Sequence, residues 1–202
     1  MNTHTTTRSG AAIFLITMML FAQSAAAADA EQGKERGFTC MGCHGIAGYR
    51  NAYPSFRVPK LGGQQGAYIE SALLAYRDGT RQHPTMRAHA ASLTDQDIEN
   101  LIAWITSSGD TRDTATAESA ALVAPAATCI ACHGADGEGV IPQPPTLAGQ
   151  EADYLEYALH QYKDGTRSGT VMGAFTAGLS DADIAQLAKF YSSQDGLKIL
   201  QQ

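Results

Sequence analysis

The sequence Cys-Met-Gly-Cys-His-Gly at residues 40–45 returns as Cys-Ile-Ala-Cys-His-Gly at residues 129–134, and these two stretches decide the fold. Three further motifs follow each of them in the same order. They are Leu-Gly-Gly-Gln at 61–64 and Leu-Ala-Gly-Gln at 147–150, Asp-Gly-Thr-Arg at 78–81 and 164–167, and Leu-Thr-Asp-Gln-Asp-Ile at 93–98 with Leu-Ser-Asp-Ala-Asp-Ile at 179–184. This conserved order and spacing within one chain indicates a tandem duplication.

The N-terminal segment has the pattern of a secretory signal. Residues 1–28 start with a polar stretch that contains Arg8, continue with an apolar run from Ala11 to Ala22, and end in four alanines. The apolar run of about a dozen residues is shorter than the roughly 20 that span a bilayer as a helix. We therefore expect cleavage after Ala28 and a periplasmic location, with an uncleaved N-terminal anchor as the alternative.

The composition argues against nucleic-acid binding. The chain has 202 residues, a formal net charge of −6 and 17% charged residues, without the clustered Lys and Arg that nucleic-acid binding requires. Residues 29–110 carry eight Lys and Arg against nine Asp and Glu, whereas residues 111–202 carry five against eleven. This asymmetry favours oriented docking with charged partners.

Each copy is predicted to be helical, so the expected fold class is all-α. Apolar residues at helical spacing recur in both copies: Ile69, Ala72, Leu73 and Tyr76 with Leu155, Ala158, Leu159 and Tyr162, and Ile98, Leu101, Ile102 and Ile105 with Ile184, Leu187, Ala188 and Tyr191. Gly79 and Gly165 suit left-handed C-caps, and Thr94 and Ser180 suit N-caps. We place a first domain at 29–110, a linker at 111–127 and a second domain at 128–202.

The histidine after each cysteine pair points to covalent haem. Two thioether bonds, from Cys40 and Cys43 or from Cys129 and Cys132, fix a haem edge while the adjacent histidine reaches the iron. A zinc site built from two cysteine pairs is an alternative, but it leaves both histidines unexplained. A dithiol redox site would need a βαβ context, which is absent from the sequence pattern. Two haem c groups are therefore predicted, with His44 and His133 as axial ligands.

The second axial ligand follows by elimination. Of the six methionines, three lie in the signal segment, and Met41 sits between the thioether cysteines of its own haem. Met86 and Met172 remain, at matching positions of the two copies. Filling a gap in the core is the ordinary role of a lone methionine, but His/Met ligation is typical of electron-carrying c-type cytochromes. His83 and His89 flank Met86 without counterparts in the second copy, so we place them in surface loops.

Two further repeated pairs are candidates for supporting the haem. Pro59 and Pro145 precede their Leu-x-Gly-Gln motifs by the same spacing, and each either supplies a carbonyl to the axial histidine or only stiffens a turn. Arg81 and Arg167 either pair with haem propionates or favour a helix C-terminus, and we prefer the second interpretation.

With these motifs in place, the chain resembles the cytochrome c4 family of dihaem proteins, which consist of two class I cytochrome c domains. The resemblance covers about residues 31–195. It implies periplasmic electron transfer, with a quinol-oxidising cytochrome complex or a dehydrogenase as donor and a terminal oxidase as acceptor, and peripheral association with membrane complexes. The stretch Gly48–Arg57 is longer and more aromatic than its partner in the second copy, a departure from the family pattern that bears on the docking surface. We expect the less acidic first half to face one partner and the acidic second half another, which charge reversals at Arg50, Arg57 and Lys60 would test.

The sequence leaves three function classes as alternatives. A diffusible electron carrier without catalytic residues fits best, because both irons are expected to carry six ligands. An enzyme, such as a dihaem peroxidase or a sulfur-compound dehydrogenase, needs a displaceable ligand and acid–base groups beside the iron. A dihaem subunit of a flavoprotein or another dehydrogenase complex would share the fold and the ligands, and sequence separates it poorly from a free carrier.

Overall fold

The computed structural model describes residues 27–109 and 123–201, together with Met1. Most of the predicted signal (residues 1–28) and most of the predicted linker (residues 111–127) lie outside these ranges. The described residues form helices joined by loops, and their extended pairing is limited to isolated bridges. The predicted all-α class is confirmed. Among the described helices, none combines the length and the apolar character needed to cross a membrane.

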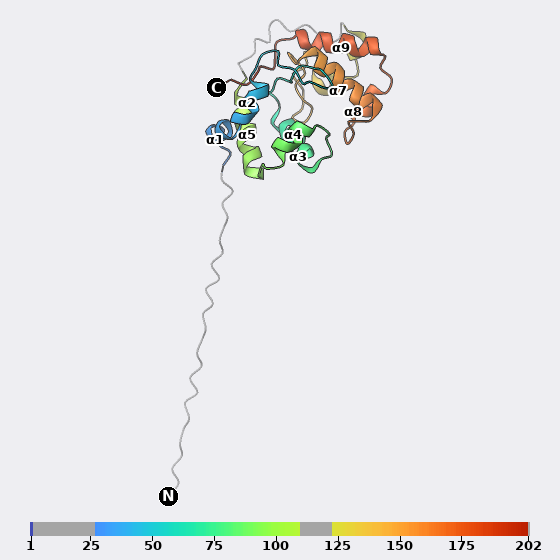
Figure 1. Ribbon diagram of the computed structural model, residues 1–202. Coiled ribbons are helices and arrows are strands. Elements are labelled where there is room, and N and C mark those ends of the chain that lie inside the picture. The colour runs from blue at the N-terminus through green and yellow to red at the C-terminus, as the bar shows by residue number, and fades with distance from the viewer. Residues whose placement is uncertain (2–26, 110–122, 202) are drawn as a thin grey trace.

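The helices fall into two groups that lie side by side in Figure 1. The first group comprises α1 (Ala30–Arg36), α2 (Phe38–His44), α3 (Gly66–Asp78), α4 (Pro84–Ala90) and α5 (Asp95–Ser107). The second comprises the 3₁₀ turn η3 (Ala124–Ala126), α6 (Ile130–His133), α7 (Ala152–Asp164), α8 (Met172–Thr176) and α9 (Asp181–Ser193). Helices α7, α8 and α9 repeat α3, α4 and α5 in order.

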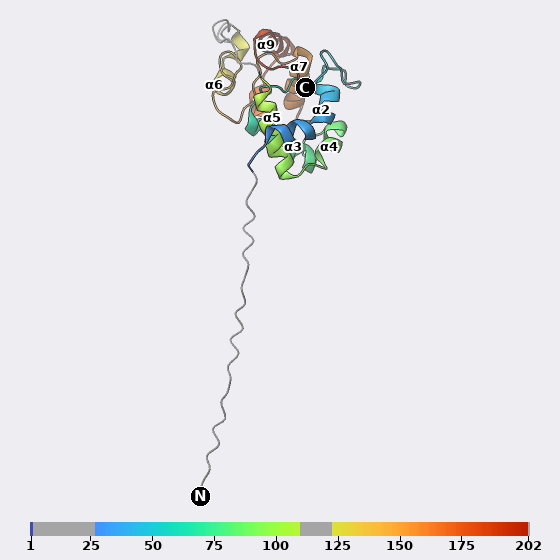
Figure 2. The ribbon, with the colours of Figure 1, turned by 90° about the vertical axis from the view of Figure 1, so that its left-hand side faces the viewer.

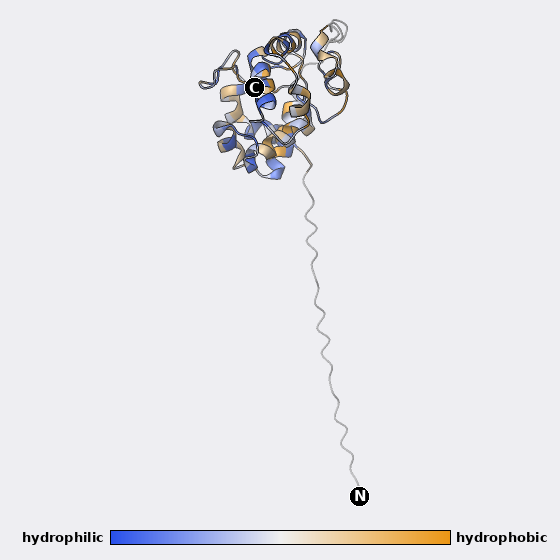
Figure 3. Ribbon diagram, turned by 90° about the vertical axis from the view of Figure 1, so that its right-hand side faces the viewer, coloured by the Kyte–Doolittle hydropathy of each residue, from blue (hydrophilic) through white to orange (hydrophobic). Residues whose placement is uncertain are grey.

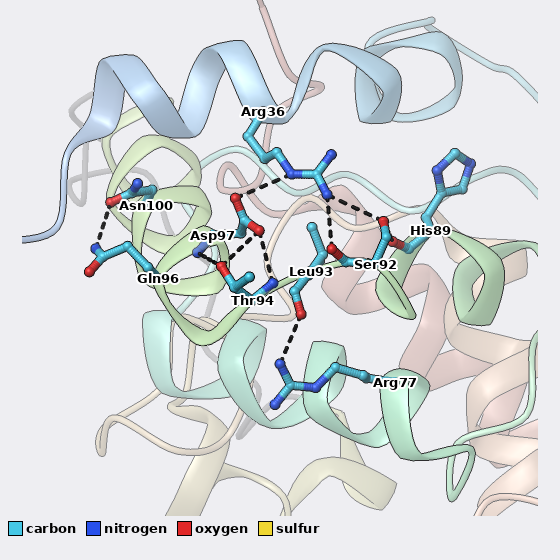
Figure 4. Close-up of polar contacts among 9 residues, drawn as sticks. All are labelled: Arg36, Arg77, His89, Ser92, Leu93, Thr94, Gln96, Asp97 and Asn100. Carbon is cyan, nitrogen blue, oxygen red and sulfur yellow. Dashed lines mark hydrogen bonds and ion pairs between the residues drawn. The ribbon is translucent and has the colours of Figure 1, made fainter.

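The predicted caps are present at the ends of the long helices. Thr94 accepts a hydrogen bond from the Asp97 backbone N–H, and the Asp97 carboxylate accepts one from the Thr94 backbone N–H, which closes a capping box (Figure 4). Ser180 and Asp183 form the same box at α9. Gly79 ends α3 in the left-handed conformation, at φ 84°, where a side chain would be strained.

Helix α1 packs directly on α5 because two glycines remove the side chains between them. A Cβ added to Gly33 would lie 1.9 Å from the backbone oxygen of Asn100, and one added to Gly37 would lie 2.2 Å from the Trp104 ring. Arg36 closes the edge of this contact through an ion pair of 3.2 Å with Asp97, as Figure 4 shows.

Each group has its own small apolar core. In the first, Ile69, Leu101, Trp104 and Ile105 are buried together, and in the second, Leu155, Leu187, Ala188, Phe190 and Tyr191 are buried around η3. Polar and apolar residues are mixed along the same helices (Figure 3), as expected of helices with one buried face.

The C-terminal segment of the second copy crosses to the first. Gly62 and Lys198 exchange two backbone hydrogen bonds of 2.9 and 3.1 Å, and the Leu200 N–H donates to the His44 oxygen over 3.0 Å. The Leu200 side chain is 1% exposed and belongs to the apolar core of the first group. The C-terminus accordingly lies beside α2 in both Figures 1 and 2.

The two halves are also joined by a nearly symmetric pair of glutamines from the Leu-x-Gly-Gln motifs. The Gln64 amide donates to the Thr146 oxygen over 3.1 Å and accepts from the Thr146 N–H over 2.8 Å. Gln150 makes the matching bonds with Lys60, at 3.0 and 2.8 Å. Since Lys60 and Thr146 occupy equivalent repeat positions, the halves meet through the same surface used twice, as in a two-fold dimer.

Candidate haem-binding sites

One cavity of about 580 Å³ runs between the two halves and brings together nearly all of the predicted site residues. It is lined by Cys40, Cys43, His44, Pro59, Arg81 and Met86 from the first half, and by Cys129, His133, Pro145, Arg167 and Met172 from the second. Of the predicted site residues only Cys132 is missing from this lining. Residues from both copies of the repeat therefore line a common cavity.

Both predicted axial histidines are buried and held by the predicted proline carbonyls. His44 ends α2 and is 8% exposed, and its Nδ1 lies 2.7 Å from the Pro59 oxygen. His133 ends α6 and is 5% exposed, with Nδ1 3.0 Å from the Pro145 oxygen. A carbonyl accepts only if Nδ1 carries the proton, which leaves the Nε2 lone pair for a metal.

Burial favours the neutral form of both imidazoles. Burial lowers the pKa of His44, and the hydrogen bond to Pro59 opposes this only in part. Burial likewise lowers the pKa of His133. A neutral imidazole is the form that binds a metal, so both side chains are prepared for ligation at neutral pH.

The four cysteines lie in or directly before short helices, and none forms a disulfide. Cys40 and Cys43 lie in α2. Cys132 lies in α6, and Cys129 directly precedes that helix. Burial raises the pKa of the Cys40 and Cys129 thiols. In the described part of the chain no three His, Cys, Asp or Glu side chains gather as a metal site, so the zinc alternative has no ligand set there.

The two methionines occupy equivalent positions of the repeat and line the same cavity as the two histidines. Met86 lies in α4 and Met172 begins α8, and both are half-buried and line the cavity. His83 is not simply a loop residue, because its Nδ1 accepts a hydrogen bond of 3.3 Å from the Met86 N–H and caps α4. His89, which Figure 4 shows on the same helix, is exposed at the cavity's edge.

Arg81 and Arg167 follow the C-terminal ends of α3 and α7, and their guanidinium groups contact tyrosine hydroxyls. Both guanidinium groups donate to the Tyr68 hydroxyl, over 3.3 and 3.1 Å, and Arg81 also donates to the Tyr154 hydroxyl over 3.0 Å. Burial would raise the pKa of Tyr68, but the two guanidinium charges and their hydrogen bonds lower it to about 7. Neither arginine forms an ion pair with a carboxylate of the described residues.

These features fit haem c. The cavity offers thiols for thioether bonds, buried histidines with a free Nε2, and methionine sulfurs as soft ligands. It also holds two guanidinium groups that form no ion pair with a carboxylate in the described ranges 27–109 and 123–201, and such cations complement the propionate groups of a haem. The donor set therefore matches the group that the motifs predict.

The basic residues Arg50, Arg57 and Lys60 contact the second half. Arg50 pairs with Asp153 over 2.9 Å and Arg57 with Glu151 over 3.1 Å. Lys60 Nζ donates to the Gly149 oxygen over 2.6 Å. Between them Phe56 is 4% exposed and stacks on Tyr157 at 4.4 Å. These three basic side chains therefore contribute to the contact between the halves, while those of Arg50 and Arg57 stay 46% exposed.

The contacts of the repeated glutamines with the opposite half were not predicted from the sequence. The Leu-x-Gly-Gln pattern was visible as a repeat, but nothing in it states that Gln64 and Gln150 reach the opposite half. The available signal was their identity between the two copies, although the residue that follows each differs, Gln65 in one and Glu151 in the other.

Comparison with known proteins agrees with the site. The cytochrome c family model matches residues 30–109 and again 117–195. Cytochrome c-552 of Acidithiobacillus ferridurans is 30% identical over 200 residues, covering 90% of this chain and 86% of that protein. A protein of Stutzerimonas stutzeri named thiosulfate dehydrogenase electron acceptor is 28% identical over 200 residues, covering 88% and 92%. The structure of reduced recombinant cytochrome c4 from Pseudomonas stutzeri matches with a TM-score of 0.66 and 28% identity, over 85% of this chain and all of that one (100%).

The two matches to the family model each contain one Cys-x-x-Cys-His motif and one half of the fold. The chain therefore carries two covalently bound haem c groups. It belongs to the cytochrome c family and is a dihaem electron carrier of the cytochrome c4 type.

Proposed function

We propose that each haem is held between one histidine and one methionine of the same half, His44 with Met86 and His133 with Met172. The thioether bonds come from Cys40 and Cys43 in the first half, and from Cys129 and Cys132 in the second. The observation that carries the proposal is the pair of buried histidines, each fixed by a proline carbonyl at the cavity that also holds the methionines. A haem c in this setting supplies a one-electron iron couple.

The remaining cavity residues bind and orient the group. Arg81 and Arg167 neutralise its propionates, and Tyr68 holds the two guanidinium groups together across the halves. The apolar side chains of both cores exclude water from the iron. Because both irons receive six ligands, the protein transfers electrons without making or breaking bonds in a substrate.

We further propose a periplasmic location, supported by the signal-like residues 1–28. The donor is a quinol-oxidising cytochrome complex or a dehydrogenase, and the acceptor is a terminal oxidase, with peripheral association at membrane complexes. Such redox partners are reached by diffusion, which suits a carrier that holds one electron per haem.

A second candidate function is that of an electron acceptor for a single dehydrogenase. The relatives from Stutzerimonas stutzeri and Thiomonas intermedia named thiosulfate dehydrogenase electron acceptor favour this candidate. Stopped-flow mixing with a thiosulfate dehydrogenase and, separately, with a quinol-oxidising complex discriminates between them. A general carrier is reduced rapidly by both enzymes, whereas a dedicated acceptor is reduced rapidly only by the dehydrogenase.

Proton NMR of the reduced protein tests the ligand assignment. Two sets of strongly shifted methionine methyl signals are expected, and Met86→Ala and Met172→Ala should each remove one set. Loss of neither set in either variant would contradict the assignment, provided that the variant retains two haems per chain.

A further inference from the structure

We propose that Gln64 and Gln150 are positioning residues, each of which tunes the axial histidine of the opposite half. This inference rests on the proposed ligation by His44 and His133. It starts from the observation that each glutamine contacts the very peptide group whose carbonyl holds a histidine on the other side of the interface.

The first such peptide group joins Pro59 to Lys60. Its carbonyl, on Pro59, accepts from His44 Nδ1 over 2.7 Å, and its N–H, on Lys60, donates to Gln150 Oε1 over 2.8 Å. A peptide group is planar, and its C=O and N–H point in opposite directions when it is trans. By holding the N–H, Gln150 therefore fixes the direction of the carbonyl that orients His44.

The second half repeats this arrangement with the roles exchanged. The Pro145 carbonyl accepts from His133 Nδ1 over 3.0 Å, while the Thr146 N–H of the same peptide group donates to Gln64 Oε1 over 2.8 Å. The amide of Gln64 also donates to the Thr146 oxygen over 3.1 Å. Each half thus supplies the outer end of the hydrogen-bond chain that ends on the histidine of the other.

Both glutamines are anchored in their own half. Gln150 Oε1 accepts a second bond of 3.0 Å from the Glu151 N–H, where α7 begins, and Gln64 Oε1 accepts one of 2.8 Å from the Gln65 N–H at the start of α3. The two side chains are 4% and 3% exposed. Since neither amide can turn to solvent, a shift of one half relative to the other is transmitted to the opposite histidine.

The chain of hydrogen bonds also has an electronic effect. An amide whose N–H is hydrogen-bonded becomes a stronger acceptor at its carbonyl, because successive bonds polarise one another. A stronger acceptor at Nδ1–H makes the imidazole a more basic ligand. A more electron-rich histidine favours the oxidised iron, so removing the glutamine should raise the reduction potential of the haem in the other half.

Gln150→Leu and Gln64→Leu test the inference through potentials measured haem by haem. Redox titration followed by NMR resolves the two haems, whose signals are assigned with Met86→Ala and Met172→Ala. We expect Gln150→Leu to shift the reduction equilibrium of the first-half haem by about threefold, roughly 28 mV at 59 mV per tenfold change. Gln64→Leu should shift the second-half haem in the same direction, and each variant should leave the haem of its own half nearly unchanged.

Gln65→Leu is the matched control. Its amide also crosses the interface, donating to the Glu138 oxygen over 3.1 Å, but that peptide group contacts His133 only at the backbone oxygen, through the Gly139 N–H, and not at the imidazole ring. Gln65→Leu should therefore weaken the interface without a selective change in the reduction potential of either haem. Gln150→Asn, which retains a polar side chain one methylene shorter, provides a second variant that should act in the direction of Gln150→Leu if the leucine variant does not fold.

The outcomes separate this inference from the ligand assignment. Equal shifts at both haems, a shift confined to the glutamine's own half, or unchanged potentials in variants that retain both haems would overturn the cross-domain role. Absence of methionine signals in the unsubstituted protein would instead overturn the proposed ligation, before any glutamine variant is considered.

Discussion

At the scale of single residues, Arg81 and Arg167 line the cavity between the two halves. Their repeat spacing was visible, but a helix end beside each Asp-Gly turn gave an adequate local explanation. Their side chains reach tyrosine hydroxyls of the other half, Arg81 to Tyr154 and Arg167 to Tyr68. Local sequence cannot reveal such a contact, since its partner lies in the other copy.

Substitution of these arginines should lower the reduction potentials. Arg81→Gln and Arg167→Gln each remove a positive charge near the iron, which favours the oxidised state. We expect decreases of roughly 20–60 mV, a two- to tenfold change in the reduction equilibrium. Redox titration measures the effect, and Arg87→Gln, at an exposed position of α4, is the control. Potentials that stay constant in both arginine variants would contradict a role beside the haem.

At the scale of helices, the sequence is a good guide. The predicted capping boxes, the left-handed Gly79 and Gly165, and the apolar faces of four helices are all present. They could be predicted because each depends on residues within a single turn or a single helix. The short helix α4 has a local start signal in Pro84 and the His83 cap, whereas α8 has no side-chain cap at its start.

Removing the cap of α5 should destabilise the first half. Thr94→Ala leaves the Asp97 N–H without its acceptor, and loss of such a cap costs about 0.5–2 kcal/mol. Thermal or denaturant unfolding of the holoprotein measures the change. Ser92→Ala, outside the box on an exposed loop, should cost less; equal losses in the two variants would argue against the capping box as the cause.

The capping carboxylate also predicts a dependence on pH. The Thr94 backbone N–H, with its hydroxyl and Arg36, holds the pKa of Asp97 below the ordinary value of 3.8. A carboxyl with a lowered pKa in the folded state stabilises the protein above 3.8, and this contribution is lost as the pH falls through the folded pKa. Asp97→Asn should therefore reduce the fall in stability below pH 4, which unfolding curves at pH 5 and pH 3 would detect. An unchanged fall would contradict the assignment.

At the scale of the whole molecule, the sequence predicts two similar units but not how they join. The C-terminal residues belong to the second copy in sequence, yet Leu200 completes the apolar core of the first. The basic residues of the 48–57 segment and Lys60 contact the second half. Duplication fixes what each unit contains, whereas these contacts arise from residues that differ between the copies.

Leu200 provides a test of this joined architecture. Leu200→Ala removes a side chain that is 1% exposed in the core of the first half, and such a truncation costs about 2–5 kcal/mol. We expect reduced unfolding stability with the loss seen first in signals of the first-half haem. Gln201→Ala, at an exposed neighbouring position, should be neutral. Destabilisation confined to the second half would contradict the crossing of the C-terminal segment.

The central claim, that this dihaem carrier closes both irons with a histidine and a methionine, is tested most directly by adding carbon monoxide to the reduced holoprotein. If all six positions are filled on each iron, the visible absorption bands of both haems stay where they are. Met172→Ala should then bind carbon monoxide at one haem of the two, which shows that the measurement can detect an open site. Rapid carbon monoxide binding by the unsubstituted protein would contradict the account, because an open or easily displaced position is what a haem enzyme requires.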